Sequence, residues 1–421
     1  MKEYLINLQL LANHVNVTTD TKATTGNELS PEMKTFYDMT LLDEAGPQLV
    51  HDQFAQKRPI PKNGGKTIEF RKFDSLPKAT APLTEGVTPD GQRLSVTAIT
   101  ATVSQYGDYI TQSDVLELTA LDNTILEATK LLGRQAGITL DTITREVLNA
   151  GTNVSFCPKL SGSTETPVDD RSKLDKTAKL TVDVVNQMVA KLRAQNAPTI
   201  NGDYVAIIHP YVAYDLMRDP EWIDAHKYSD AGALFNGEIG KIGGVRFVST
   251  TEAKIFWGEN LGGDDVRELT AAANASSAIT SLAVSGATLT ADALIGREII
   301  INGVKATITD NDASSLTFAS TNFGTITSGT TKIYPGEGAS DGGAVFSTLF
   351  MGAGAYGVTE VEGGGLETIV KQKGSAGTAD PLDQRSSVGW KAIKTAELLL
   401  DQYLIRCESC SPRYSAAAKA N

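Results

Sequence analysis

The chain has 421 residues, of which 41% are hydrophobic and 6% aromatic, and it carries three cysteines and a formal charge of −12. A chain of this length buries enough surface to fold without disulfides or metals, and the length suggests two or three domains. Proteins that bind nucleic acid directly usually carry a basic surface, so the excess of acidic residues disfavours direct DNA binding. An odd number of cysteines favours free thiols and synthesis in a reducing cytoplasm.

The first segment, residues 1–57, combines a polar arm with a helix. Residues 1–29 are rich in Thr, and such a segment buries too little apolar surface to order by itself. Its start lacks the apolar stretch of a signal peptide, and no run in the chain approaches the roughly 18 apolar residues of a membrane-spanning helix. Ser30 and Pro31 then predict the start of a helix.

Residues 58–110 predict a long two-stranded arm. Residues 66–73 and 93–104 alternate apolar and polar side chains, which is typical of strands. The apolar phase of the second strand slips between Ala98 and Ile99, and this slip predicts a β-bulge. Prolines fill the stretch between the strands and prevent it from pairing in a sheet. Because a hairpin of this kind is marginal alone in water, we expect it to need a packing partner.

Two segments, 111–180 and 181–261, contain the main predicted helices. Apolar residues at three-and-four spacing from Leu121 to Val147 predict one long amphipathic helix. A shorter helix is predicted to start at Thr181.

A buried strand is predicted over 204–208, where five apolar residues follow one another. It ends at His209, which we interpret as a boundary residue that makes a local hydrogen bond. A helix up to Asp219 follows, and a strand begins at Gly243.

Residues 262–342 predict an all-β insertion, because Ala, Ser, Thr and Gly dominate and only strand patterns occur. Asn302 and Gly303 supply both positive-φ positions of a type I′ hairpin turn. Gly-Gly pairs at both ends predict flexible joints. The flanking strands around Ile255 and Phe346 are therefore expected to lie close together. The chain then returns through strands in 343–365 and 366–421.

Four motifs resemble parts of enzyme sites, and each lacks the context that the chemistry needs. The Gly-x-G-x-x-Gly pattern at 352–357 is followed by a strand pattern instead of a helix. Ser340 sits in a nucleophile-elbow pattern, but no helix follows and all four histidines precede it. The phosphate-loop remnant at 64–67 lacks its first glycine and also runs into a strand. Cys407 and Cys410 form a lone Cys-x-x-Cys pair, which free thiols explain better than zinc. We predict no catalytic residue, cofactor or metal.

The order of elements resembles tailed-bacteriophage major capsid proteins with the Hong Kong ninety-seven-type fold. Thr84-Glu85-Gly86 followed by Pro89, between two long strands, resembles the tip of that family's extended loop. Residues 204–210 and 243–248 resemble its axial domain. The C-terminal stretches resemble the last strands of its peripheral domain, at 388–394 and 404–412.

The resemblance implies an α+β fold with the following parts: N-terminal arm and first helix (1–57), extended loop (58–110), spine helix and peripheral domain (111–180), axial domain (181–261), all-β insertion (262–342), return through the axial domain (343–365), and peripheral domain with C-terminal strands (366–421). The insertion departs from the family pattern. We expect it to protrude from the axial domain on the outer face and to serve lattice contacts or decoration, unless it is a tolerated ornament.

The implied function is structural, without enzymatic activity or cofactor. Copies of the chain would assemble in the host cytoplasm into hexamers and pentamers of an icosahedral head that encloses double-stranded DNA without sequence-specific binding. Scaffold, portal and decoration proteins would be further partners, and no membrane would be involved. Candidate inter-subunit contacts are Lys78, Glu85, Gly86 and Pro89. Two alternatives stay open: a secreted or surface β-rich adhesin-like protein, and an enzyme with an unrecognised site.

Overall fold

The computed structural model describes residues 50–421, with these exceptions: 63, 74–75, 77, 81, 84, 87, 89–90, 120–123, 163, 227–239, 263–265, 362–365, 372–379, 381, 383 and 417. The predicted arm at 1–29 and the helix after Ser30 therefore lie outside the described residues. The chain forms two compact units. Unit 1 contains Lys57–Ile143 and Val358–Ala396, and the described part of unit 2 contains 50–56, 144–357 and 397–421.

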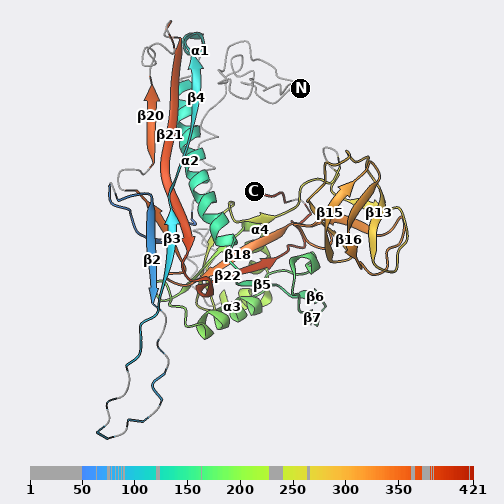
Figure 1. Ribbon diagram of the computed structural model, residues 1–421, viewed down its shortest axis with the longest axis horizontal. Helices are drawn as coiled ribbons and strands as arrows, with labels where there is room; N and C mark the ends of the chain where they lie inside the picture. The colour runs from blue at the N-terminus through green and yellow to red at the C-terminus, as the bar shows by residue number, and fades with distance from the viewer. Residues whose placement is uncertain are drawn as a thin grey trace. The chain divides into compact units, whose positions relative to one another are not determined.

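Unit 1 is built on a five-stranded sheet in which the 14-residue strand β21 is central. The sheet order is β1 (Gln56–Lys57), β19 (Tyr356–Glu360), β21 (Arg385–Leu398) and β20 (Glu367–Lys371), and β4 (Ser104–Ser113) also pairs with β21. The long helix α2 (Thr124–Asn149) runs beside β4 and β21 (Figure 1). The short helix α1 (Asp114–Thr119) precedes it.

Helix and sheet in unit 1 meet through apolar side chains at matching periodicities. Leu132 and Ala136 lie one helical turn apart on α2, and Val388, Trp390 and Ala392 alternate along β21; all five are buried in one cluster. A helix repeats its face every three to four residues and a strand every two. The apolar residues whose spacing predicted the helix are therefore the residues that pack against the sheet.

Unit 1 also contains a separate antiparallel pair, β2 (Thr67–Phe73) and β3 (Val96–Thr102). The register is continuous over all seven pairs, from Thr67↔Thr102 to Phe73↔Val96, so the β-bulge predicted between Ala98 and Ile99 is wrong. The side chains of β3 are mostly exposed up to Ala98. Because neither face is buried there, the apolar phase can change without any change in pairing.

Unit 2 contains a mixed seven-stranded sheet. Its strands, in sheet order, are β5 (Val154–Phe156), β22 (Leu404–Ser409), β18 (Val345–Met351), β8 (Tyr204–Ile208), β10 (Val245–Ser249) and β9 (Lys241–Ile242), with β11 (Ile255–Phe256) paired to β18. All residues of β8 and β18 are buried, which explains their continuous apolar runs. The segment predicted as 366–421 is thus divided, because β21 belongs to the first sheet and β22 to this one.

The described part of unit 2 contains three helices besides the end of α2, of which the first two start as predicted and the third, after Pro220, was not predicted. They are α3 (Val182–Ala194), α4 (Pro210–Met217) and α5 (Pro220–His226). The Thr181 hydroxyl accepts a hydrogen bond from the Val184 backbone N–H at 3.4 Å. The His209 ring accepts one at Nδ1 from the Tyr211 N–H at 3.2 Å, as the predicted boundary residue should. Short elements complete the unit: the hairpin β6 (Lys159–Ser161) and β7 (Thr164–Thr166), and two 3₁₀ turns, η4 (Arg171–Lys173) and η6 (Asp401–Tyr403).

The predicted all-β insertion is a closed six-stranded barrel within unit 2 (Figure 1). Around the barrel the strands are β12 (Leu269–Ala271), β13 (Ile279–Ser285), β16 (Ser315–Thr321), β15 (Val304–Asn311), β14 (Glu298–Ile301) and β17 (Lys332–Pro335). Its interior forms an apolar cluster distinct from that of the parent sheet. Asn302 and Gly303 have φ values of 50° and 78°, which confirms the hairpin. Ile255 pairs with Phe346, which confirms that the flanking strands meet.

The joints of the barrel are packed and hydrogen-bonded at the described glycines, and the predicted flexibility stays a prediction. Arg267 donates from Nε to the Gly258 carbonyl at 3.2 Å and from Nη1 to the Gly342 carbonyl at 3.0 Å. Its guanidinium lies 3.4 Å from the centre of the Trp257 ring. A Cβ atom at Gly342 would collide with the ring of Tyr334. These glycines allow close packing of the two segments that connect the barrel to the parent sheet.

We predict that the barrel can be removed if the cut spares the residues that pack in the parent core. Gly258 packs directly against Pro335, so a short Gly-Ser linker should replace residues 259–335 and leave the parent sheet folded. A cut at 264–341, between the two Gly-Gly pairs, also deletes Ala339, which is buried in the parent core, and Ser340, which donates to the Leu174 carbonyl at 2.6 Å.

Circular dichroism and thermal melting of both variants test the boundary. The 259–335 replacement should melt cooperatively, and the 264–341 replacement should melt at a lower temperature. An unfolded product from the first cut would show that the barrel strands belong to the parent core.

We also predict that His209 makes unit 2 acid-sensitive. Burial lowers the pKa of His209 from 6.5 to about 4, so the folded ring stays neutral while the unfolded ring takes up a proton below pH 6.5. Stability is present above that pH and is lost as the pH falls toward 4, by up to about 3 kcal/mol from this group.

The test compares the wild type with His209→Asn, whose amide oxygen can still accept from the Tyr211 N–H. Urea unfolding at about pH 7 and about pH 4 should show a smaller loss of stability in the variant. The same loss in both proteins would contradict the assignment.

Candidate functional site

The β2–β3 arm, defined here as residues 67–102, is buried at its base and exposed toward its tip. Phe70 and Ala101 are 4% and 1% exposed. In contrast, every described residue from 76 to 95 is exposed. This exposed stretch includes large apolar side chains at Leu76 (54%), Leu83 (78%) and Leu94 (70%).

The described residues of the tip from 76 to 94 bury none of their side chains within unit 1. The ion pair between Arg71 Nε and Glu69 Oε1 at 3.0 Å lies on the arm itself and is exposed, and pairs of this kind contribute at most about 1 kcal/mol. A two-stranded ribbon with a long loop is marginal by itself. The arm therefore presents apolar surface whose burial needs a partner.

Three of the four predicted contact residues lie on this exposed stretch. Lys78, Glu85 and Gly86 are exposed, and Pro89 lies outside the described residues. Gly86 has a φ of 77°, a left-handed conformation that other residues adopt only with strain. No atom lies within 4 Å of the position of a Cβ there. The tip is thus a turn that requires glycine for its backbone and leaves room around it.

The enzyme-like motifs fold as the sequence predicted. The glycine pattern at 352–357 lies between β18 and β19, so a strand follows it where a dinucleotide site needs a helix. Ser340 is followed by β18 and its hydroxyl is bound to the Leu174 carbonyl. Residues 64–67 lead into β2.

The three cysteines are buried free thiols. Cys157 and Cys407 Sγ atoms are 3.6 Å apart, and burial raises the pKa of the Cys410 thiol. Among the described residues, no group of three or more His, Cys, Asp and Glu side chains could hold a metal ion. In the same part of the chain, no helix is long and apolar enough to cross a membrane.

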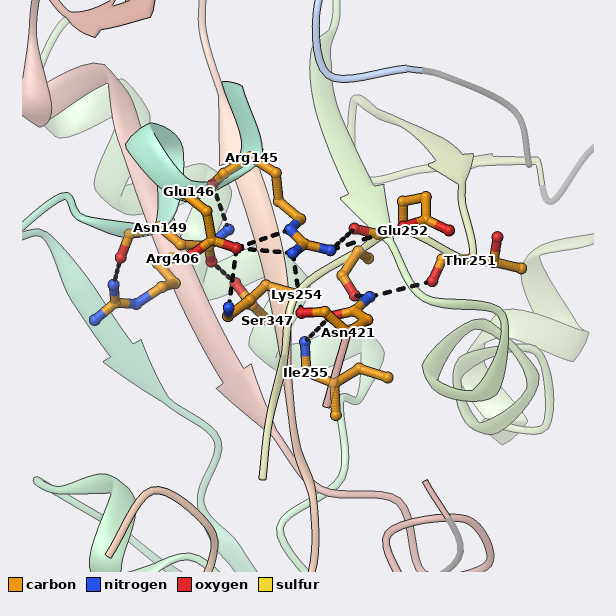
Figure 2. A network of polar contacts seen from close by, with 11 residues as sticks. Arg145, Glu146, Asn149, Thr251, Glu252, Lys254, Ile255, Ser347, Arg406 and Asn421 are labelled. Carbon is orange, nitrogen blue, oxygen red and sulfur yellow. Dashed lines mark hydrogen bonds and ion pairs between the residues drawn. The ribbon is translucent and has the colours of Figure 1, made fainter. Parts of the chain in front are cut away.

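A polar network in unit 2 joins residues far apart in sequence, and the sequence did not predict it (Figure 2). Arg145 Nη2, near the end of α2, donates to Glu146 Oε1 at 2.8 Å and to the Asn421 backbone carbonyl at 2.9 Å. Lys254 Nζ reaches the same Glu146 oxygen at 2.9 Å. The Asn421 side chain accepts from the Ile255 N–H at 3.0 Å.

The charges in this network are matched. Burial alone would raise the pKa of Glu146, but hydrogen bonds from Lys254 and Arg145 outweigh it and hold the pKa below its usual value. The Arg145 side chain is 3% exposed, and a guanidinium is retained at such depth only with acceptors around it. The network thus links the end of α2, the strand β11 and residue 421 to one another.

A second buried cluster surrounds Glu408 on β22, which is fully buried. Arg171 binds its carboxylate in a bidentate manner at 2.6 and 2.5 Å, and Arg406 Nε lies 3.0 Å from Glu408 Oε1. The Arg171 guanidinium also lies 3.5 Å from the centre of the Phe256 ring. These contacts rigidify the subunit, and none of them exposes a reactive group.

Comparison with known proteins agrees with this arrangement. In a search of solved structures, the capsid of cyanophage P-SCSP1u matches with a TM-score of 0.54 and 12% identity over 90% of this chain and 93% of that one. The capsid of cyanophage Pam1 matches with a TM-score of 0.53 and 11% identity over 94% and 100%. The capsid of Ralstonia phage GP4 gives 0.50 and 12% over 93% and 98%.

At these identities the likeness shows the fold, and it confirms the predicted α+β class of phage capsids. No curated protein sequence matches the chain. A sequence profile described as phage capsid protein matches residues 32–374. Because this match covers most of the chain, the chain belongs to the phage capsid protein family.

Proposed function

We propose that this structural major capsid protein forms its shell through rings of identical subunits, hexamers and pentamers, in which a neighbouring copy covers the β2–β3 arm. The observation that supports the proposal best is the exposed apolar surface of the arm at Leu76, Leu83, Leu94 and Val96. Four large apolar side chains on one thin projection are unfavourable in a lone subunit. They are favourable once a neighbour buries them.

Symmetry explains how such an arm can serve every subunit. In a ring, each copy makes the same head-to-tail contact with the next, and the contacts close by rotation. A subunit that both gives and receives an arm gains two contacts from one feature, and many weak contacts in a shell add by multivalency. A marginal arm in the free subunit is therefore compatible with a stable particle.

The tip residues Lys78, Glu85, Gly86 and Pro89 are the contacts that we propose to meet the neighbour. Their exposure, where described, leaves them accessible. Lys78 and Glu85 carry opposite charges, so the tip can match acidic and basic groups on the neighbour. Gly86 keeps the turn compact enough to fit between other chains.

We further propose the partners that such a shell requires. Scaffold, portal and decoration proteins would join it during assembly in the host cytoplasm, and the shell would enclose double-stranded DNA without sequence-specific binding. The charge of −12 supports the last point, because a protein with net negative charge is not attracted overall to the DNA backbone. The buried thiols and the glycine motifs between strands, together with the absence of a metal cluster among the described residues, favour a role without catalysis.

The barrel would add lattice contacts or a site for decoration proteins on the outer face of the shell. Its separate apolar core supports this proposal, because the barrel does not complete the parent sheet. Ile295 and Val304 are exposed on it, at 51% and 36%.

The arm proposal predicts that tip variants lose assembly and keep the subunit fold. Replacing Leu83 with Asp removes an apolar side chain from the tip. Replacing Glu85 and Gly86 with Trp and Val alters the turn. Both changes lie at exposed positions that contribute little to the fold of the free subunit. We expect the yield of particles to fall at least about tenfold, because losing about 1.4 kcal/mol per contact already gives that factor. The melting temperature of the free subunit should change by no more than about 4 °C.

Particle yield is measured by sedimentation and electron microscopy, and subunit stability by calorimetry. Leu382→Asp is the matched control, since it places the same charge on a leucine outside the arm that is 75% exposed. Equal damage to assembly and to subunit melting would show that the arm packs within its own chain.

A further inference from the structure

A cavity in unit 2 of about 420 Å³ is lined by the segment before η4 and by the barrel. Its size falls within the range of about 300–1,000 Å³ typical of small-ligand sites. Ten described residues line it: Lys159, Thr166, Pro167, Val168, Lys173, Asn302, Gly303, Lys332, Tyr334 and Ser340.

The charge of this lining is one-sided. Three of the lining residues are lysines, and none of those that the structure describes is acidic. The ammonium groups have carboxylate partners outside the lining: Lys159 Nζ with Asp175 Oδ2 at 3.1 Å, Lys173 Nζ with Asp169 Oδ1 at 2.7 Å, and Lys332 Nζ with Glu268 Oε1 at 2.6 Å. The lining of the cavity is therefore positively charged, although each lysine together with its carboxylate partner is neutral.

The lysines keep donors available for a further anion. An ammonium has three N–H donors, and the ion pairs described take one each. Lys332 gives a second to the Thr270 hydroxyl at 3.0 Å. All three pairs are partly or largely exposed to solvent, and pairs of that kind contribute little, so the side chains can turn toward a new anion at small cost.

The Tyr334 hydroxyl in the lining already donates to Glu268 Oε2 at 3.3 Å, so the lysines supply the donors for an anion. Burial and the neighbouring Glu268 raise the pKa of Tyr334 to about 12, so the phenol remains protonated at neutral pH and adds no negative charge to the cavity. The hydrogen bond to Asp169 raises the pKa of Lys173, so this ammonium stays charged.

We propose that this cavity binds a phosphate-class oxyanion through Lys159, Lys173 and Lys332. A phosphate group carries close to two negative charges and several acceptor oxygens, which matches three ammonium groups better than a single carboxylate does. The site lies between the barrel turn at Asn302–Gly303 and the strand β17 on one side and the β6–β7 segment on the other. A bound anion would bridge the barrel and the parent unit. This inference goes beyond the shell-forming role and does not depend on it.

Inorganic pyrophosphate is the probe, titrated into the full-length unassembled subunit by isothermal calorimetry in chloride buffer of matched ionic strength. We expect saturable binding of one anion per chain. The variant Lys159→Gln/Lys332→Gln should bind at least about tenfold more weakly, since each lost charged hydrogen bond weakens binding by that order. Lys173→Gln alone should show a smaller loss in the same direction.

The matched control is Lys391→Gln in unit 1, an exposed lysine with a carboxylate partner, Glu367, at 3.0 Å. It should bind pyrophosphate as the wild type does, and circular dichroism should show that all variants are folded. Absence of saturable binding, or equal binding by the wild type and the lysine variants, would overturn the proposal.

Competition then assigns the source of the phosphate. A short DNA duplex that displaces pyrophosphate from the wild type, and not from a surface control, supports a phosphodiester ligand. Displacement by orthophosphate and not by the duplex supports a free anion.

Discussion

Burial of apolar surface holds most of the described chain together, and one part, the β2–β3 arm, leaves apolar side chains exposed toward its tip. The parent sheet of unit 2, the barrel and the face between α2 and β21 each enclose an apolar cluster. The β2–β3 arm encloses none beyond its base, and Leu83 is 78% exposed near its tip. Exposed apolar area is unfavourable by roughly 25 cal/mol per Å², and this cost supports the proposal that a second copy covers the arm.

Unit 2, in contrast, is cross-linked by polar side chains. Buried guanidinium groups link segments that are distant in sequence, as when Arg145 binds residue 421 and Arg171 binds Glu408. At the base of the barrel, Arg267 binds both segments that connect the barrel to the parent sheet. Removing one partner of a buried ion pair such as Arg171–Glu408 typically costs about 3–5 kcal/mol. These links therefore hold distant segments of unit 2 together.

The sequence predicted the elements whose causes are local. The helix spacing at Leu132 and Ala136, the cap at Thr181 and the turn at Asn302–Gly303 each depend on residues a few positions apart, and all three are confirmed. The meeting of Ile255 and Phe346 followed from treating the residues between them as an insertion.

What the sequence did not predict depends on distant partners. Arg145 and Asn421 are 276 positions apart, and nothing in either local pattern indicates that they meet. The bulge expected at Ala98 and Ile99 does not form, because this part of the arm has no buried face that would require one. The glycines at Gly342 and Gly343 suggested flexibility, whereas close packing explains them. The contacts proposed for Lys78, Glu85, Gly86 and Pro89 concern other copies, and they stay predictions.

Hydrogen–deuterium exchange across residues 67–102 tests the central claim most directly. In the free subunit, the amides of β2 and β3 should exchange quickly, because a two-stranded ribbon opens easily. In the assembled shell they should become strongly protected, while the amides of β8 and β18 are protected in both states. Equal exchange of the arm in the free subunit and in the shell would contradict the account.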